Sequence, residues 1–165
     1  GIYRQMIEMV HAKGAKVLLD ADGELFTKAL EAGPDIIKPN RVELEQYAGL
    51  DYVASEQEIV QIAGKLAEKG IEKVVVSMGK SGAIFLENGF KVKCQGLNVK
   101  AHSTVGAGDA MVAGLSYAWD KGLSAEETVK LCMAVSAGAV TTIGTKPPSR
   151  ELVDTLMEQV TVEEI

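Results

Sequence analysis

The sequence has few cysteines, few aromatic residues and no excess of basic charge. Its two cysteines, Cys94 and Cys132, form no CxxC or Cys/His pair. That pattern argues against a zinc site and favours buried structural thiols in a reducing compartment. The formal net charge is −6, so the clustered Lys and Arg that would bind nucleic acid or an anionic membrane surface are lacking.

Long apolar runs and a signal peptide are also missing. No stretch approaches the ~20 apolar residues that a helix needs to cross a bilayer, and the N-terminus carries no leader pattern. What is present is 165 residues with 47% hydrophobic content, enough to bury the core of one domain. We therefore expect a cytoplasmic globular protein whose main partner is a small molecule.

Short apolar runs alternate with segments of helical periodicity. This alternation predicts an α/β fold with a mostly parallel sheet, and Asn88-Gly89 predicts one antiparallel hairpin. We find no internal repeat and no linker, so residues 1–165 are treated as one domain. The predicted strands are 16–20, 35–38, 73–77, 83–86 and 90–94; the predicted helices are 2–14, 24–32, 41–47, 55–69, 110–121, 124–142 and 149–159, followed by a short tail at 160–165.

The segment 102–114 carries the strongest functional pattern. Gly106-Ala107-Gly108 lack large side chains, so successive backbone N–H groups can approach a ligand at the positive end of the following helix. Asp109 falls in the first helical turn. A carboxylate there would repel a bound phosphate, so its presence beside an anion site suggests a catalytic role. The alternative is a glycine-rich helix start in which Asp109 only complements the helix dipole.

Two further loops are expected at the carboxyl ends of strands, where ligands bind in such sheets. Asn40 and Glu43, three residues apart, are either an N-cap and its capping-box partner or oxygen ligands of Mg²⁺. The segment 77–82 is either a plain turn or a phosphate-binding loop, in which Lys80 neutralises charge. Neither glycine segment has the spacing of a P-loop or of the Rossmann fingerprint.

Taken in order, the motifs Lys38-Pro39-Asn40-Arg41-x-Glu43, Ser77-x-Gly79-x-x-Gly82 and Ser103-Thr104-Val105-Gly106-Ala107-Gly108-Asp109 resemble those of the ribokinase-like (PfkB) family of ATP-dependent sugar kinases. Ser103 stands where many members carry Asp. The residues of the first motif, together with Ser103, are most similar to those of the branch of 1-phosphofructokinases and tagatose-6-phosphate kinases. The resemblance implies a three-layer α/β fold and transfer of the ATP γ-phosphoryl to a hydroxyl of a phosphohexose.

The resemblance also implies a role for each motif. Asp109 would be the general base, and the N–H groups of Gly106, Ala107 and Gly108 the anion hole. Asn40 and Glu43 would organise Mg²⁺. The side chains and backbone expected to bind the nucleotide are Ser77, Gly79, Lys80, Gly82 and Ser136; for the helix of Ser136, tight core packing is the alternative.

The resemblance covers the C-terminal half of the family's domain only. A sheet of which half is absent would expose a strand edge and an apolar face, which another chain or a second copy would cover. We therefore expect MgATP binding with little sugar phosphorylation by this chain alone. Fructose 1-phosphate is the expected acceptor, tagatose 6-phosphate or a nucleoside is the alternative, and a nucleotide-binding module without catalysis is the alternative of another class.

Overall fold

The computed structural model describes residues 1–165, which form seven α-helices, one short 3-10 helix and six strands. The chain divides into two compact units, residues 1–78 with 84–91 and residues 79–83 with 92–165. The two units are described separately below. No helix combines the length and the apolar character needed to cross a membrane.

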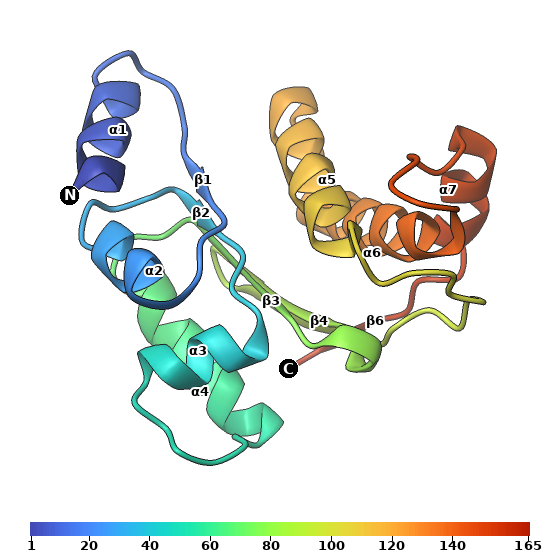
Figure 1. Ribbon diagram of the computed structural model, residues 1–165, viewed down its shortest axis with the longest axis horizontal. Helices are drawn as coiled ribbons and strands as arrows, with labels where there is room; N and C mark the ends of the chain where they lie inside the picture. The colour runs from blue at the N-terminus through green and yellow to red at the C-terminus, as the bar shows by residue number, and fades with distance from the viewer. The chain divides into compact units, whose positions relative to one another are not determined.

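The first unit follows the predicted alternation closely (Figure 1). Its helices are α1 (Ile2–His11), α2 (Gly23–Leu30), α3 (Arg41–Tyr47) and α4 (Glu56–Ala67), and its strands are β1 (Leu18–Leu19), β2 (Ile36–Ile37), β3 (Lys73–Ser77) and most of β4 (Ala83–Glu87). Because parallel strands need crossover connections, α2 lies between β1 and β2 in the sequence, and α3 and α4 lie between β2 and β3. The α/β fold class is thereby confirmed.

Strands β1, β2 and β3 pair in parallel, with Leu18 opposite Ile36 and Ile36 opposite Lys73. Every residue of β3 except the last, Ser77, is buried. A strand that is buried along its length needs cover on both faces. The predicted strand 73–77 is therefore confirmed, and its β-branched run packs into a core that also contains Phe26, Leu44, Ile59, Leu66 and Ile84.

The hydrogen-bonded strand order is β1-β2-β3-β4-β5-β6. Strands β4 and β5 (Phe90–Cys94) are joined by Asn88 and Gly89, both of which have positive φ, 43° and 86°. Two left-handed residues are what a two-residue hairpin turn requires, and Asn-Gly accepts that geometry best. The predicted hairpin is confirmed.

The second unit contains three helices, α5 (Ala107–Lys121), α6 (Ala125–Thr141) and α7 (Arg150–Met157), and the 3-10 turn η1 (Gly79–Ser81). Gly122 ends α5 with φ 64°. Ser124 caps α6, with Glu127 accepting a hydrogen bond from the Ser124 backbone. Both boundaries agree with the predicted helices, of which the first ends at 121 and the second begins at 124.

The prediction that residues 160–165 form only a tail is wrong. Val162–Glu164 is strand β6, antiparallel to β5, with Val162 opposite Cys94. Helix α5 also begins at Ala107, three residues before the predicted residue 110. Glycine is disfavoured inside helices, so Gly106 and Gly108 hide this start in the sequence. In the structure Gly106 lies outside the helix, as a left-handed N-cap with φ 88°.

Neither cysteine forms a disulfide, and both are buried, as predicted. Burial raises the pKa of the Cys94 thiol to about 11. A thiol with that pKa is almost fully protonated at neutral pH and is a poor nucleophile. Cys94 and Cys132 therefore serve as small apolar residues in the core.

Candidate functional site

The N-terminus of α5 is left open by its own sequence. Gly106 is the N-cap and provides no side-chain hydrogen bond, whereas Asn40, Ser55, Ser124 and Ser149 cap α3, α4, α6 and α7. The first N–H groups of a helix have no partner within the helix. At α5 no N-cap side chain accepts a hydrogen bond from these groups.

The turn before α5 is fixed locally. Ser103 Oγ accepts the Val105 N–H at 3.1 Å, and the Ala107 N–H reaches the Thr104 carbonyl at 3.5 Å. Gly108 and Asp109 follow in the first turn of α5, where backbone N–H groups have no partner within the helix. The residues predicted as the anion hole and the predicted base therefore share one helical turn.

Helix α6 packs against α5. Gly114 lies where the helices come close: a Cβ at this position would be 3.1 Å from Val135 Cγ2 and 3.3 Å from Cys132 Sγ. Near the open end of α5, Ser136 Oγ donates a hydrogen bond to the Ala107 carbonyl at 3.1 Å. Ser136, predicted to bind nucleotide, thus contacts the backbone of the anion-hole turn; its contact with nucleotide stays a prediction.

A cavity of about 780 Å³ runs along α5, α6 and α7. Its walls are mostly apolar, and Gly106 and Asp109 lie in its lining. Lys146 and Arg150 contribute the cationic side chains of the lining. The volume is within the range of small-molecule sites, so the Asp109 carboxylate has space for a ligand beside it.

The loop 79–82 has the tight backbone that a phosphate-binding turn needs. Gly79 and Gly82 have φ of 58° and 97°, a region that only glycine enters at no steric cost. At Gly82 a Cβ would lie 1.9 Å from the Cys94 carbonyl oxygen. The Gly82 N–H bonds to the Gly79 carbonyl at 3.1 Å, and Lys80 is exposed between them.

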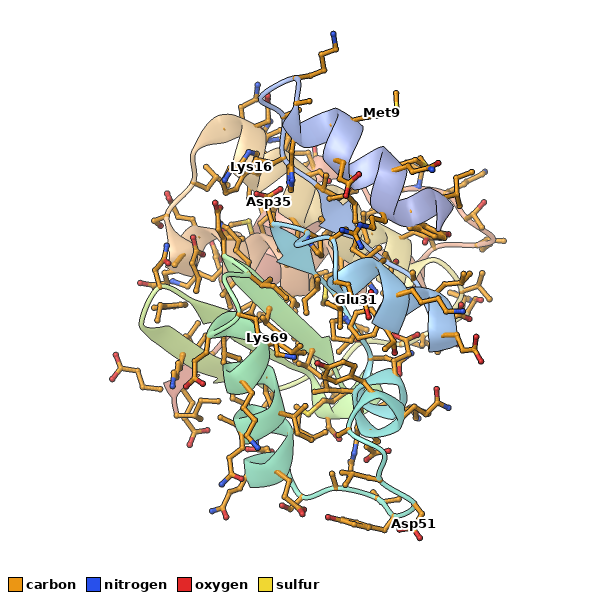
Figure 2. The ribbon with its side chains drawn as sticks, turned by 90° about the vertical axis from the view of Figure 1, so that its left-hand side faces the viewer. Met9, Lys16, Glu31, Asp35, Asp51 and Lys69 are labelled. Atoms are coloured by element: carbon orange, nitrogen blue, oxygen red, sulfur yellow. The ribbon has the colours of Figure 1, made fainter.

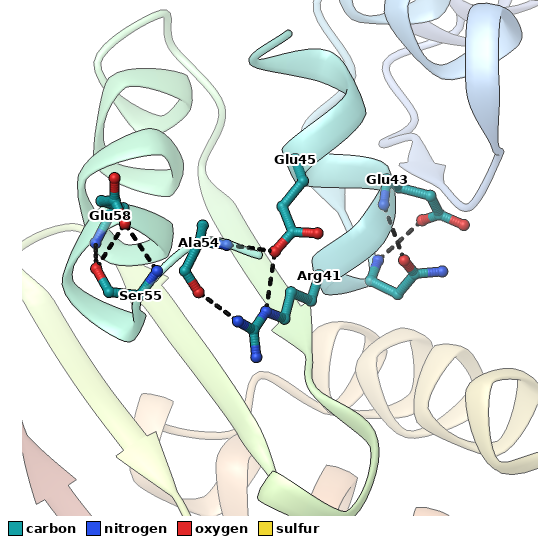
Figure 3. Close-up of polar contacts among 7 residues, drawn as sticks. Arg41, Glu43, Glu45, Ala54, Ser55 and Glu58 are labelled. Carbon is teal, nitrogen blue, oxygen red and sulfur yellow. Dashed lines mark hydrogen bonds and ion pairs between the residues drawn. The ribbon is translucent and has the colours of Figure 1, made fainter. Parts of the chain in front are cut away.

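In the first unit, Asn40 and Glu43 form the capping box that the sequence allowed. The Glu43 N–H donates to Asn40 Oδ1 at 2.9 Å, and the Asn40 N–H donates to Glu43 Oε2 at 2.8 Å. Figure 3 shows these contacts at the start of α3. The capping interpretation is confirmed. Metal binding stays a prediction, for which Glu43 Oε1, outside the box, is the oxygen available.

The oxygens present fit a magnesium ion that keeps most of its water. Mg²⁺ in nucleotide sites takes one or two protein carboxylates besides water and phosphate oxygens. Glu43 offers one carboxylate oxygen, and no cluster of three His, Cys, Asp or Glu side chains forms a denser metal site. Glu43 would hold the ion, and Asn40 would act mainly by fixing the Glu43 backbone.

Two charged residues to which the sequence analysis gave no role lie at the carboxyl ends of β1 and β2. Lys38, which follows β2, is buried, and its Nζ lies 3.2 Å from Oδ1 of Asp20, which follows β1. The Ser77 N–H donates to the Pro39 carbonyl at 3.1 Å, so Asn40 pairs with Ser77 as an isolated bridge. In the sequence, a charged residue directly follows each of these short apolar runs, and that pattern could have indicated the pair of Asp20 and Lys38.

A second network fixes α3 beside these residues. Glu45 is buried and accepts hydrogen bonds from Arg41 Nε at 3.0 Å and from the Ala54 N–H at 2.8 Å, while the Arg41 guanidinium also donates to the Ala54 carbonyl (Figure 3). This arrangement ties the helix to the loop before α4. It satisfies a buried carboxylate, which would otherwise be costly.

The predicted site residues therefore fall into two groups. Gly106, Ala107, Gly108, Asp109 and Ser136 come together at the open end of α5, in the same unit as Gly79, Lys80 and Gly82. Asn40, Glu43 and Ser77 lie together in the other unit.

Comparison with known proteins gives one family. The model of the pfkB family carbohydrate kinases matches residues 2–152. Among curated relatives, the 1-phosphofructokinase of Haemophilus influenzae is 38% identical over 162 residues, which cover 98% of this chain and 51% of that protein. This chain spans about half the length of the curated relatives it matches.

Solved structures agree. Phosphofructokinase-2 from Escherichia coli, crystallised in complex with potassium, superimposes with a TM-score of 0.87 at 28% identity over 95% of this chain and 51% of that chain. Ribokinase from Arabidopsis thaliana, complexed with ribose and ATP, gives a TM-score of 0.81 at 26% identity over 95% of this chain and 52% of that chain. Similarity of this extent confirms the ribokinase-like fold.

Proposed function

This chain belongs to the pfkB family of carbohydrate kinases, and from that membership we propose that it carries the nucleotide-binding and catalytic part of an ATP-dependent phosphohexose kinase. The observation that supports this most strongly is the open start of α5. Backbone donors without a capping side chain stand there beside a carboxylate that lines a cavity. Anion binding and proton removal are then available within one helical turn.

In this proposal Asp109 is the general base. It takes the proton of the acceptor hydroxyl as the oxygen attacks the γ-phosphorus of ATP, and ADP leaves. The N–H groups of Gly106, Ala107 and Gly108 hold the negative charge on the transferred group, because fixed donors need no reorganisation when charge develops. A carboxylate beside the anion hole repels bound phosphate until it takes up that proton.

The remaining predicted residues bind the donor. Ser77, Gly79, Lys80 and Gly82 line the triphosphate, with Lys80 as the cation. Glu43 holds Mg²⁺, and Asn40 fixes Glu43 through the capping box. When bound, the ion neutralises phosphate charge during phosphoryl transfer.

Fructose 1-phosphate is the acceptor we propose. The support is the 38% identity with a relative named 1-phosphofructokinase, and tagatose 6-phosphate is the alternative within the same chemistry. We also propose a cytoplasmic location, where ATP is abundant and reduced thiols such as Cys94 and Cys132 persist. A homo-oligomer is consistent with the exposed apolar stripe of Ile2, Met6 and Met9 on α1.

A nucleotide-binding module without catalysis is the second candidate. The supporting observation is that the chain spans only half of its relatives' length, so half of each relative has no counterpart in these 165 residues.

The test is calorimetric titration of this protein with MgATP, followed by an ADP-release assay with fructose 1-phosphate, tagatose 6-phosphate and fructose 6-phosphate. Both are repeated after adding the separately expressed half of the Haemophilus influenzae relative that this chain does not cover. We expect MgATP binding in both samples and ADP release with fructose 1-phosphate once the second half is present. Binding without transfer in either sample would favour the module, and no binding would contradict both candidates.

A further inference from the structure

Ser136 makes a hydrogen bond that is unusual for a helical serine. Serine and threonine hydroxyls inside helices commonly donate to the carbonyl one turn earlier in their own helix. Ser116 does so to Val112 at 2.9 Å, and Thr128 to Ser124 at 2.8 Å. Ser136 instead donates from α6 across to the carbonyl of Ala107, the first residue of α5, at 3.1 Å.

The turn that receives this bond is held by backbone hydrogen bonds, such as that from the Ala110 N–H to the Gly106 carbonyl at 2.8 Å, but by no capping side chain. Its N-cap, Gly106, offers no side chain, and Gly108 follows two residues later. Glycine loses more backbone freedom on ordering than any other residue, and helix ends without a cap fray. The Ala107 N–H contact with Thr104, at 3.5 Å, is long for a hydrogen bond.

Peptide planarity connects this bond to the anion hole. The Ala107 carbonyl and the Gly108 N–H belong to the same rigid, trans peptide group, so the two dipoles point in opposite directions. A donor on α6 that holds this carbonyl therefore also restricts the direction of the Gly108 N–H. Gly108 is one of the residues whose N–H is proposed to hold charge on the transferred phosphoryl group.

We propose that Ser136 is a positioning residue for the phosphoryl-transfer site: its hydroxyl fixes the Ala107–Gly108 peptide and so aims the Gly108 N–H at the anion. This rests on the proposed kinase function for its consequence, while the positioning itself is a property of the unliganded protein. Preorganised donors act most on the charge that develops in the transition state. Loss of the bond therefore weakens transition-state binding more than binding of ground-state nucleotide.

The test compares three variants with the wild type. Ser136→Ala removes the donor, and Ser136→Thr keeps a hydroxyl at the same position. Ser116→Ala is the matched control, because it removes a hydroxyl from α5 that also bonds to a backbone carbonyl, but within the helix. All variants are measured as the complete 165-residue chain.

The first measurement is amide hydrogen exchange without nucleotide, read at Ala110, whose N–H donates to the Gly106 carbonyl at 2.8 Å. Exchange of a hydrogen-bonded amide reports local opening of the helix end. A net hydrogen bond of ordinary strength corresponds to a roughly three- to tenfold change in the opening equilibrium. We expect that acceleration at this amide in Ser136→Ala, with wild-type rates in Ser116→Ala and in Ser136→Thr.

The second measurement is affinity for MgADP and for MgADP with aluminium fluoride, a mimic of the transferred phosphoryl group. We expect Ser136→Ala to lower affinity for the mimic several-fold and to leave MgADP affinity within about twofold. Unchanged exchange in Ser136→Ala, equal acceleration in Ser116→Ala, or no recovery in Ser136→Thr would overturn the proposal. A wild-type chain that binds no MgADP would contradict the proposed function and leave the exchange result to decide the positioning role.

Discussion

The side chains of Asn40 and Glu43 each hold the other's backbone amide, at 2.9 and 2.8 Å. Ser55 and Glu58 form the same box at the start of α4, with Glu58 Oε2 2.8 Å from the Ser55 N–H. The two glutamates are therefore equivalent as caps. They differ in place, since Glu43 follows β2 at the carboxyl edge of the parallel strands, where ligands bind in such sheets.

This pair of boxes separates capping from metal binding. Glu43→Gln keeps a capping-box acceptor but loses the carboxylate charge, so we expect a higher Mg²⁺ concentration for half-maximal MgATP binding. Glu58→Gln makes the same change at the other box and should leave the Mg²⁺ titration unaltered. Nucleotide binding followed at increasing Mg²⁺ checks both; equal titrations for the two variants would return Glu43 to a capping role alone.

The assignment of Asp109 predicts a separation of rate from affinity. Asp109→Asn removes the base while preserving the shape of the side chain, so phosphoryl transfer should fall by roughly 10²–10⁴. Nucleotide affinity should stay close to the wild-type value or rise, because a charge that repels phosphate is removed. Asp120→Asn, at an exposed position near the other end of α5, is the control for charge change. Loss of MgATP binding in Asp109→Asn with intact Asp120→Asn would contradict the assignment.

Gly82 and Gly64 give opposite predictions for the same change. Gly82→Ala puts a Cβ 1.9 Å from the Cys94 carbonyl at a φ of 97°, so we expect destabilisation of more than about 2 kcal/mol and loss of nucleotide binding. Gly64 lies inside α4, and a Cβ there would have no atom within 4 Å. Gly64→Ala should stabilise the chain by roughly 0.5–1 kcal/mol. Urea denaturation of both variants measures the difference, and equal effects would contradict the close approach at Gly82.

Asp35 predicts where acid weakens the first unit. Burial raises its pKa, but hydrogen bonds from the Val17 N–H at 2.7 Å, His11 at 2.8 Å and Lys16 together lower the pKa below its ordinary value of 3.8. Figure 2 shows Lys16 and Asp35 close together and Asp51 at a distant loop. A depressed pKa means that the ionised carboxylate stabilises the fold above its unfolded pKa, and that this stabilisation is lost as pH falls through the native pKa.

We therefore expect Asp35→Asn to lower the free energy of unfolding by about 1 kcal/mol at pH 7, with the difference from wild type shrinking below about pH 4. Asp51→Asn, at an exposed position, should change little at either pH. Thermal unfolding from about pH 3 to pH 7 provides the measurement. A deficit that persists unchanged at the acid end of this range would show that the Asp35 charge is not what stabilises this cluster.

The strands and helices that the sequence predicted are those with strong local signals. Ser55 with Glu58, Ser124 with Glu127, and Asn88-Gly89 fix their elements through contacts within a few residues, and the structure has the predicted helices and hairpin at these places. Strand β6 carries no such signal. Val162–Glu164 is short and mostly exposed, and its pairing with β5 joins segments about 70 residues apart in the sequence.

The same distinction between local signals and long-range contacts applies to the residues of the candidate site. The open start of α5 could be read from Gly106-Ala107-Gly108, because missing side chains are visible in a sequence. The Lys38–Asp20 pair and the Ser136 hydrogen bond could not, since each joins residues whose distance depends on the packing of neighbouring strands or helices.

The measurement that tests the central claim most directly is a titration of isotopically labelled protein with MgATP, followed by the backbone amide signals. The account predicts the largest shifts at Gly106, Gly108 and Asp109, with a second group at Gly79–Gly82. The Asp109→Asn variant should show the same pattern. If the amide signals of both groups do not move, or if the shifts are confined to α1 and α2, the result would contradict a nucleotide site at the start of α5.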